Sequence, residues 1–116
     1  MRILPKRINA KKFQKKWAEL QKLLASKETW PLAVVTADKL LDEALKKKRC
    51  KGKSMGERLV SAQRQLSDND SVWFAHNLAK KLQENSSKRL RQIDVKRSLL
   101  GVGKALRDLE ILRDKN

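Results

Sequence analysis

Several residue types are scarce in this chain of 116 residues. It contains one Cys, two Pro, four Gly, two Phe and no Tyr. A single Cys excludes an internal disulfide, and so few Gly, Pro and aromatic residues argue against a protein of strands and tight turns. Apolar runs are short as well, four residues at most. No segment therefore has the roughly 18 to 20 apolar residues that a membrane-spanning helix needs.

Acidic residues are also few, since 13 Asp and Glu stand against 29 Lys and Arg and leave a net charge of +16. Such an imbalance predicts a polyanionic partner, with nucleic acid ranked first and an anionic membrane last. The chain starts with cations and lacks the apolar stretch of a signal peptide, which together with the lone Cys predicts a cytoplasmic location.

The remaining composition, 40% hydrophobic and 36% charged, is typical of a helical protein. Apolar residues recur every three or four positions, which predicts amphipathic helices. We expect an all-α fold, a compact antiparallel bundle of four to five helices that forms one domain over residues 1–116. The periodicity predicts helices at 10–26, 31–48, 55–66, 71–84 and 95–113.

The helix ends have sequence signals of their own. Gly52 is expected to take a left-handed turn that closes the second helix. Ser54 and Glu57 match a capping box that starts the third. Asp94 is expected to cap the last helix, after an irregular link at 90–93. Gly101 and Gly103 interrupt that helix, which predicts a close crossing with a neighbouring helix.

The positive charge gathers at the two ends of the chain and in the cluster 46–53, whereas residues 60–87 are neutral in sum. The cluster is either a phosphate-binding patch or a solvated helix end that complements the helix dipole. The predicted nucleic-acid-binding residues are the cations of this cluster and those on the solvent side of the two terminal helices: Lys11, Lys15, Lys22, Lys46, Lys47, Lys48, Arg49, Lys51, Lys53, Arg97, Lys104 and Arg107.

Trp73 falls almost opposite Phe74 and Leu78 on the fourth helix, so it is expected on the polar face. It could pack against the N-terminal segment, mediate self-association, or stack on a nucleic-acid base. The predicted partner or stacking surface consists of Trp73, His76, Asn77 and Lys80.

Catalytic and metal-binding signals are missing. His76 and Cys50 are the only residues of their types, and no acidic cluster surrounds them, so no metal site and no cofactor are expected. A hydrogen-bonded structural role is predicted for His76. The cations around Cys50 could lower its pKa, although a bystander thiol is the more common case. No catalytic residue is assigned, and the chain is not expected to be an enzyme.

Three strings carry a family resemblance: residues 37–42, residues 52–59 with the sequence GKSMGERL, and residues 70–78. They resemble a family of small, functionally uncharacterised, all-helical bacterial proteins. That family is distantly similar to HEPN-type helical bundles, which often act as ribonucleases through an Arg, a polar residue and a His. The corresponding positions here are Ala79, Lys80 and Glu84, so none of these catalytic residues is present. The resemblance implies a helical bundle and possible homodimerisation along the fourth helix.

Together these features predict a protein that binds nucleic acid, RNA more than DNA, through charge and shape and without catalysis. The alternative is a protein-interaction module or a homodimeric, degenerate HEPN-like module. A third hypothesis, a ribonuclease with a non-standard site, would need His76 or Glu84. Neither a small-molecule substrate nor a membrane partner is expected.

Overall fold

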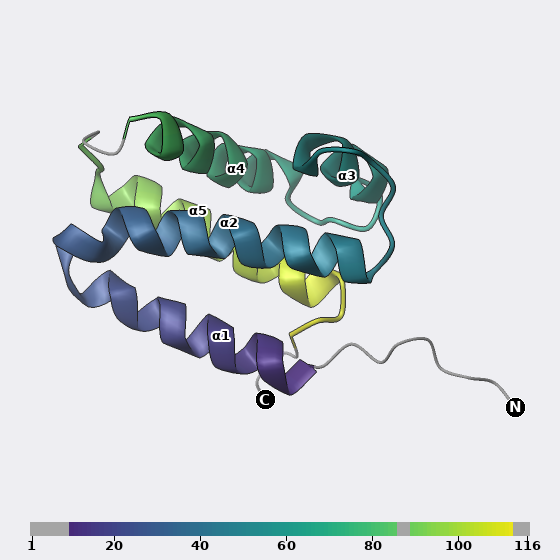
Figure 1. The fold of residues 1–116 in the computed structure, drawn as a ribbon, viewed down its shortest axis with the longest axis horizontal. Coiled ribbons are helices and arrows are strands. Elements are labelled where there is room, and N and C mark those ends of the chain that lie inside the picture. Colours follow the sequence, from purple (N-terminus) through teal and green to yellow (C-terminus); the bar gives the residue numbers. More distant parts are fainter. Residues whose placement is uncertain (1–9, 86–88, 113–116) are drawn as a thin grey trace, which may run out of the picture.

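A computed structural model describes residues 10–85 and 89–112 of the chain, and helices account for most of them (Figure 1). No strand occurs in this part, so the predicted all-α fold is confirmed. Two short 3-10 turns, η1 and η2, join the first two α-helices. The elements in chain order are α1 (Ala10–Lys22), η1 (Leu23–Ala25), η2 (Lys27–Thr29), α2 (Trp30–Lys47), α3 (Met55–Ala62), α4 (Asn69–Glu84) and α5 (Gln92–Asp108).

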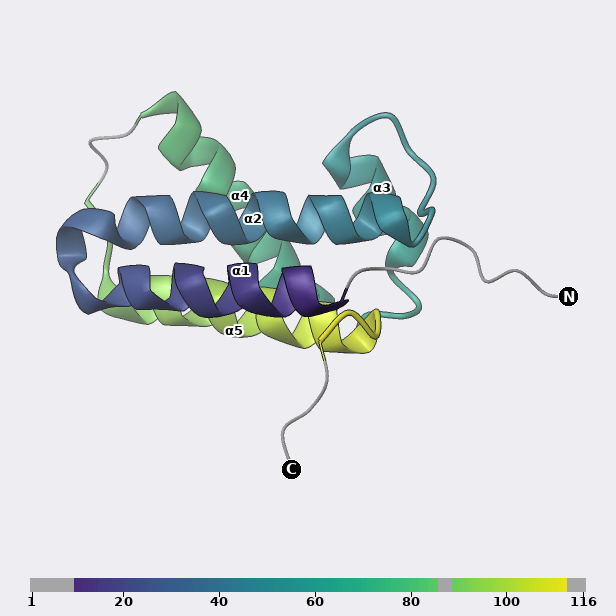
Figure 2. The same ribbon diagram turned by 60° about the horizontal axis from the view of Figure 1, so that its bottom comes forward.

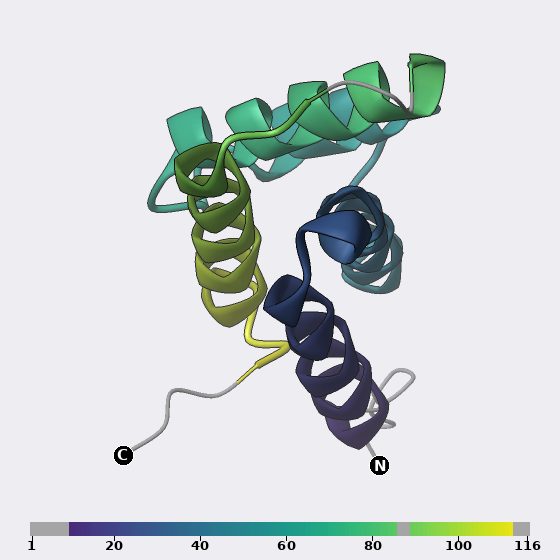
Figure 3. The same ribbon diagram turned by 90° about the vertical axis from the view of Figure 1, so that its left-hand side faces the viewer.

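Helix α2 is the centre of the bundle. Viewed nearly along its axis, it has α1 below, α5 to one side and α4 above (Figure 3). Small residues on its inner face, such as Ala33, Ala37 and Ala44, are fully buried and let the neighbouring helices approach closely. The largest fully buried side chains come from all five α-helices and include Phe13, Leu41, Leu59, Val72 and Leu106.

Helix α1 ends at Lys22, four residues before the predicted end. The next residues form two 3-10 turns, and side chains from the end of η2 and the start of α2 bond the carbonyl groups of η1. The Thr29 hydroxyl donates to the Leu23 carbonyl, and Nε1 of Trp30 donates to the Leu24 carbonyl at 2.9 Å. These bonds turn the chain sharply, so α2 runs antiparallel to α1 (Figure 2).

The prediction that Gly52 closes α2 is wrong. The left-handed residue is Arg49, with φ of 62°. Its N–H bonds the Lys46 carbonyl, and the Cys50 N–H bonds the Leu45 carbonyl, each at 2.9 Å, which is a Schellman motif. Gly52 is needed for a different reason, since a Cβ there would lie 2.7 Å from the backbone nitrogen of Arg58.

The predicted start of α3 is confirmed. The Ser54 hydroxyl accepts the N–H of Glu57 at 3.2 Å. The Glu57 carboxylate accepts the N–H of Lys53 at 2.8 Å, one residue before the donor of a standard capping box. Glu57 therefore fixes the end of the connecting loop as well as the helix start.

Helix α5 packs against the first half of α4. Asp68 caps α4 by accepting the N–H of Ser71 at 3.1 Å. A Cβ on Gly101 would lie 2.9 Å from the Ser71 carbonyl oxygen, and one on Gly103 would lie 2.9 Å from the Trp17 ring. The predicted close helix crossing is confirmed at Gly101, which meets the backbone of α4, whereas Gly103 leaves room for the Trp17 side chain of α1.

The predicted cap at Asp94 is wrong, because α5 begins two residues earlier, at Gln92. Asp94 lies inside the first turn and bonds Arg91, with its Oδ2 at 3.0 Å from Nε. An acid in that position complements the helix dipole without capping. The predicted end of this helix, at residue 113, lies outside the described residues; α5 itself ends at Asp108.

None of the helices in residues 10–85 and 89–112 is both long enough and apolar enough to cross a membrane.

Candidate nucleic-acid interface

The fold brings most of the predicted cations to one end of the bundle. Helix α1 begins there, and α2 ends there (Figure 1). Lys16 and Glu43 form an ion pair at 3.5 Å, which aligns the first half of α1 with the second half of α2. We call the following eight residues the basic end: Lys11, Lys15, Lys46, Lys47, Lys48, Arg49, Lys51 and Lys53.

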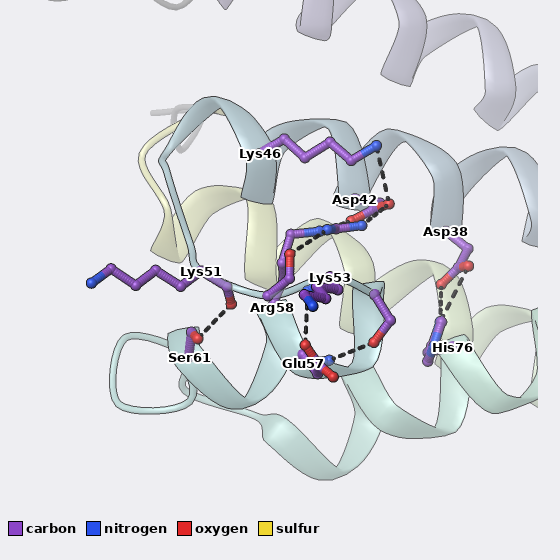
Figure 4. Close-up of polar contacts among 11 residues, drawn as sticks. Asp38, Asp42, Lys46, Lys51, Lys53, Glu57, Arg58, Ser61 and His76 are labelled. Carbon is purple, nitrogen blue, oxygen red and sulfur yellow. Dashed lines mark hydrogen bonds and ion pairs between the residues drawn. The ribbon is translucent and has the colours of Figure 1, made fainter.

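All residues of the basic end are exposed except Lys48, which is half-buried. Lys46 is paired with Asp42, although the Nζ to Oδ2 distance of 3.8 Å makes this a weak contact. For Lys47, Lys51 and Lys53, no ion pair with a described acidic residue is found. The ammonium group of Lys51 extends away from the molecule (Figure 4). Unpaired ammonium groups on a convex surface are available to external anions.

The main partner of Asp42, an acidic residue near the basic end, is Arg58. Asp42 receives both Nε and Nη2 of Arg58, at 2.7 and 2.9 Å (Figure 4). Nη1 of the same guanidinium donates to the Gly52 carbonyl at 2.9 Å. The hydrogen bonds to Asp42 raise the pKa of Arg58. Arg58 therefore compensates the charge of Asp42, whereas Glu57 stays charged while it accepts the neutral Lys53 N–H. The cations of the basic end still outnumber the acidic residues beside them.

The remaining four predicted cations lie elsewhere. Lys22 is at the other end of α1, about 16 Å from Lys11 along the helix axis. Arg97, Lys104 and Arg107 lie on the outer face of α5. The Arg97 guanidinium lies 4.4 Å from the centre of the Phe74 ring, and Lys104 contacts Asp68 at 3.6 Å. The twelve predicted residues thus do not form one patch.

The predicted exposure of Trp73 is wrong. Its ring is half-buried and packs against Gly56 at the start of α3. Its edge also contacts His76, with ring centres 5.8 Å apart and planes at 73°. Periodicity placed Trp73 on the polar side of α4, but α3 covers that side. The Trp73 ring therefore packs against α3 and is not fully open to solvent.

His76 is also buried, which corrects its expected place on the polar face. Its Nδ1 lies 3.1 Å from Oδ1 of Asp38, which comes from α2 (Figure 4). Asn77 and Lys80 are exposed, so the predicted partner or stacking surface keeps only two of its four residues. The hydrogen bond expected for His76 is present.

Asp38 was not identified from the sequence as a candidate functional residue, although its position on α2 indicated burial. It interrupts the buried stripe of α2 between Ala37 and Leu41. Burial raises the pKa of its carboxyl group, an effect that the hydrogen bond and the charge of His76 oppose. A buried Asp–His pair can orient a general base, but no Ser, Thr or Cys hydrogen bond to the described His76 is found. The pair therefore ties α4 to α2.

Metal and thiol chemistry lack support in the described residues. No group of three or more His, Cys, Asp or Glu in that part of the chain could hold a metal ion. Cys50 is half-buried, and burial raises its pKa more than Lys48 and Arg58 lower it. This direction is opposite to the lowering that the surrounding cations could produce.

Comparisons of the chain with family models, with curated proteins and with solved structures found no match. Its function is therefore inferred from the side chains described above.

Proposed function

We propose that the chain binds nucleic acid, and RNA in particular, through contacts between the basic end and backbone phosphates. The observation that supports this proposal is the separation of charge at that end. Arg58 compensates the charge of Asp42, while Lys47, Lys51 and Lys53 remain exposed. A surface of this kind releases counterions from a nucleic acid when it binds.

Recognition of charge and shape, without base reading, fits the side chains at this end. Lysine is a flexible point charge suited to phosphate, whereas base-edge recognition uses planar groups in fixed geometry. Trp73, the aromatic residue considered for base stacking, packs on α3. The preference for RNA rests on the resemblance to HEPN-type bundles. No catalytic step is included in the proposal.

A salt titration tests the proposal. Fluorescence anisotropy would follow binding of a labelled 20-nucleotide RNA and of the same sequence as DNA, over a series of KCl concentrations. With about six phosphate contacts, the plot of log K against log salt should have a slope of about −4 to −5. Binding with no salt dependence, or no binding to either oligonucleotide at low salt, contradicts the proposal. Tighter binding to DNA contradicts the preference for RNA.

A pair of charge-matched variants locates the site. Lys47→Gln with Lys51→Gln removes two exposed lysines of the basic end, and should reduce the magnitude of the slope by about 1.5 to 2. Lys27→Gln with Lys81→Gln removes two exposed lysines outside the basic end and should leave it nearly unchanged. Equal losses in both variants would mean that net charge, and not the basic end, determines binding.

A further inference from the structure

Helix α5 has a second apolar feature besides its buried stripe. Ile93 is 66% exposed and Leu100 is 69% exposed, and both lie on the side that faces away from the core. They are seven residues apart, which places them two turns or about 10 Å from each other along one helix face. The other large exposed apolar residues in the described part of the chain, Leu32 and Val60, lie singly on α2 and α3. Two such residues in line are typical of a helix face that packs against a partner.

A groove runs beside these two residues, between α5 and the start of α4. It has a volume of about 350 Å³. Gly101 lies in its lining and contributes no side chain there. A second groove, of about 310 Å³, lies on the opposite side of Leu100, between α5 and α1. Leu100 lines both grooves and so forms a ridge between them.

The groove toward α4 is strongly basic. We call its α5 side the α5 ridge, which consists of Ile93, Lys96, Arg97, Leu100, Lys104 and Arg107. Asp68 is the one acidic residue among the described residues that line this groove. It is already engaged by the Ser71 N–H and by Lys104. Four cations and one acidic residue therefore line the groove around two apolar side chains.

We propose that the α5 ridge docks an acidic amphipathic helix of a protein partner. Leucine-sized side chains of such a helix, spaced one and two turns apart, fit over Ile93 and Leu100 and into the groove beside them. Glu and Asp residues that flank those side chains complement the surrounding cations. A nucleic acid would leave Ile93 and Leu100 without an apolar partner. A second copy of the chain, packed ridge to ridge, would place its four cations against the four cations of the first copy. The inference is independent of the nucleic-acid proposal, because the basic end shares no residue with the α5 ridge.

A synthetic peptide pair tests the chemistry of the partner. The probe is a labelled 18-residue helix with Leu at helical spacing on one face and Glu on the other. The control peptide has the same charge, with each Leu replaced by Ser. Anisotropy at 150 mM KCl should give at least tenfold tighter binding of the Leu peptide to the full-length protein. Equal affinities, or no binding of the Leu peptide, would overturn the proposal.

Variants of the full chain locate the binding site of the peptide. Ile93→Ser with Leu100→Ser leaves every charge in place and should weaken the Leu peptide at least tenfold, with RNA affinity unchanged. Leu32→Ser with Val60→Ser, the matched control on other exposed apolar residues, should leave peptide affinity unchanged. Unchanged peptide affinity in the first variant would overturn the proposal. A loss of RNA binding in that variant would also overturn it. So would sedimentation that shows a dimer for the wild type and a monomer for the variant.

Discussion

At the junction of α2, α3 and α4 the buried and half-buried charges are paired, whereas at the basic end and on the α5 ridge most cations face solvent. Asp42 holds Arg58 through two bonds, and Asp38 holds His76. A few residues away, Lys47 and Lys51 form no ion pair with a described residue. The two kinds of region are neighbours in space, so their difference comes from side-chain chemistry and burial and not from distance.

The comparison separates charges that maintain the fold from charges available to a partner. The junction uses Arg58, whose planar guanidinium matches a carboxylate in two places and is only 11% exposed. Breaking such a pair leaves a charge without its partner in a poorly solvated place. The exposed lysines have no comparable cost of removal, because water solvates them in the folded and unfolded states alike.

Replacing Arg58 should give the largest loss of stability. Arg58→Met removes two bonds to Asp42 and one to Gly52, and should lower the free energy of unfolding by about 2 to 3 kcal/mol. Lys51→Met, its exposed counterpart, should cost less than about 0.5 kcal/mol. Urea denaturation of both variants measures the difference. Similar losses in the two variants would mean that the paired and exposed cations do not differ.

Replacing Asp38 tests the other pair at the junction. Asp38→Ala leaves Nδ1 of His76 buried without its acceptor, which should cost about 1 to 2 kcal/mol of unfolding free energy. Asp38→Asn keeps an oxygen acceptor and should lose less. Thermal and urea denaturation of both variants checks the order. A gain in stability for Asp38→Ala would show that the cost of burying the carboxylate exceeds the benefit of the pair.

Asp68 contributes both to the fold and to the surface of the α5 ridge, since it caps α4 and lines the groove beside that ridge. Hydrogen bonds from Ser71 lower its pKa below 3.8. The ionised form is therefore favoured by folding, and its contribution is present above pH 3.8 and lost as the pH falls through the lowered pKa.

Asp68→Ala should therefore cost about 1 kcal/mol at pH 7, the usual value of a helix cap, and less as the pH falls below 3.8. Asp68→Asn keeps the capping oxygen without the titration, so it should stay close to the wild type at pH 7. Urea denaturation at pH 7 and pH 3 measures both. A loss that is the same at the two pH values would contradict a role for the ionised carboxylate.

Much of the fold could be predicted from the sequence, because apolar residues at helical spacing indicate where the helices lie. Ser54 and Glu57 marked the start of α3, and Gly101 marked the crossing of α5 with α4. The errors occurred where a tertiary contact competed with a local signal. Arg49 takes the left-handed turn at the end of α2, and Gly52 instead lies close against the backbone of α3.

The site was less predictable, since it depends on which helix covers which face. Trp73 and His76 lie toward the polar side of α4 by periodicity, but α3 covers Trp73, and Asp38 of α2 meets His76. The opposite error occurred at the α5 ridge, where exposed apolar residues were not recognised from the sequence. Ile93 fell in a segment predicted to be irregular, and Leu100 gave no signal beyond lying outside the buried stripe of α5.

The smallest predicted effect separates stability from charge at the basic end. Arg49 and Glu110 close α2 and α5 in the left-handed conformation, with φ of 62° and 64°. Glycine adopts that conformation without steric cost, so Arg49→Gly and Glu110→Gly should each raise the free energy of unfolding by about 0.5 kcal/mol. RNA affinity should fall for Arg49→Gly and should not fall for Glu110→Gly, because the first variant removes a cation and the second an acid. Urea denaturation and RNA anisotropy on the same preparations make the comparison. Equal changes of RNA affinity in the two variants would mean that the turn conformation, and not the charge of Arg49, matters for binding.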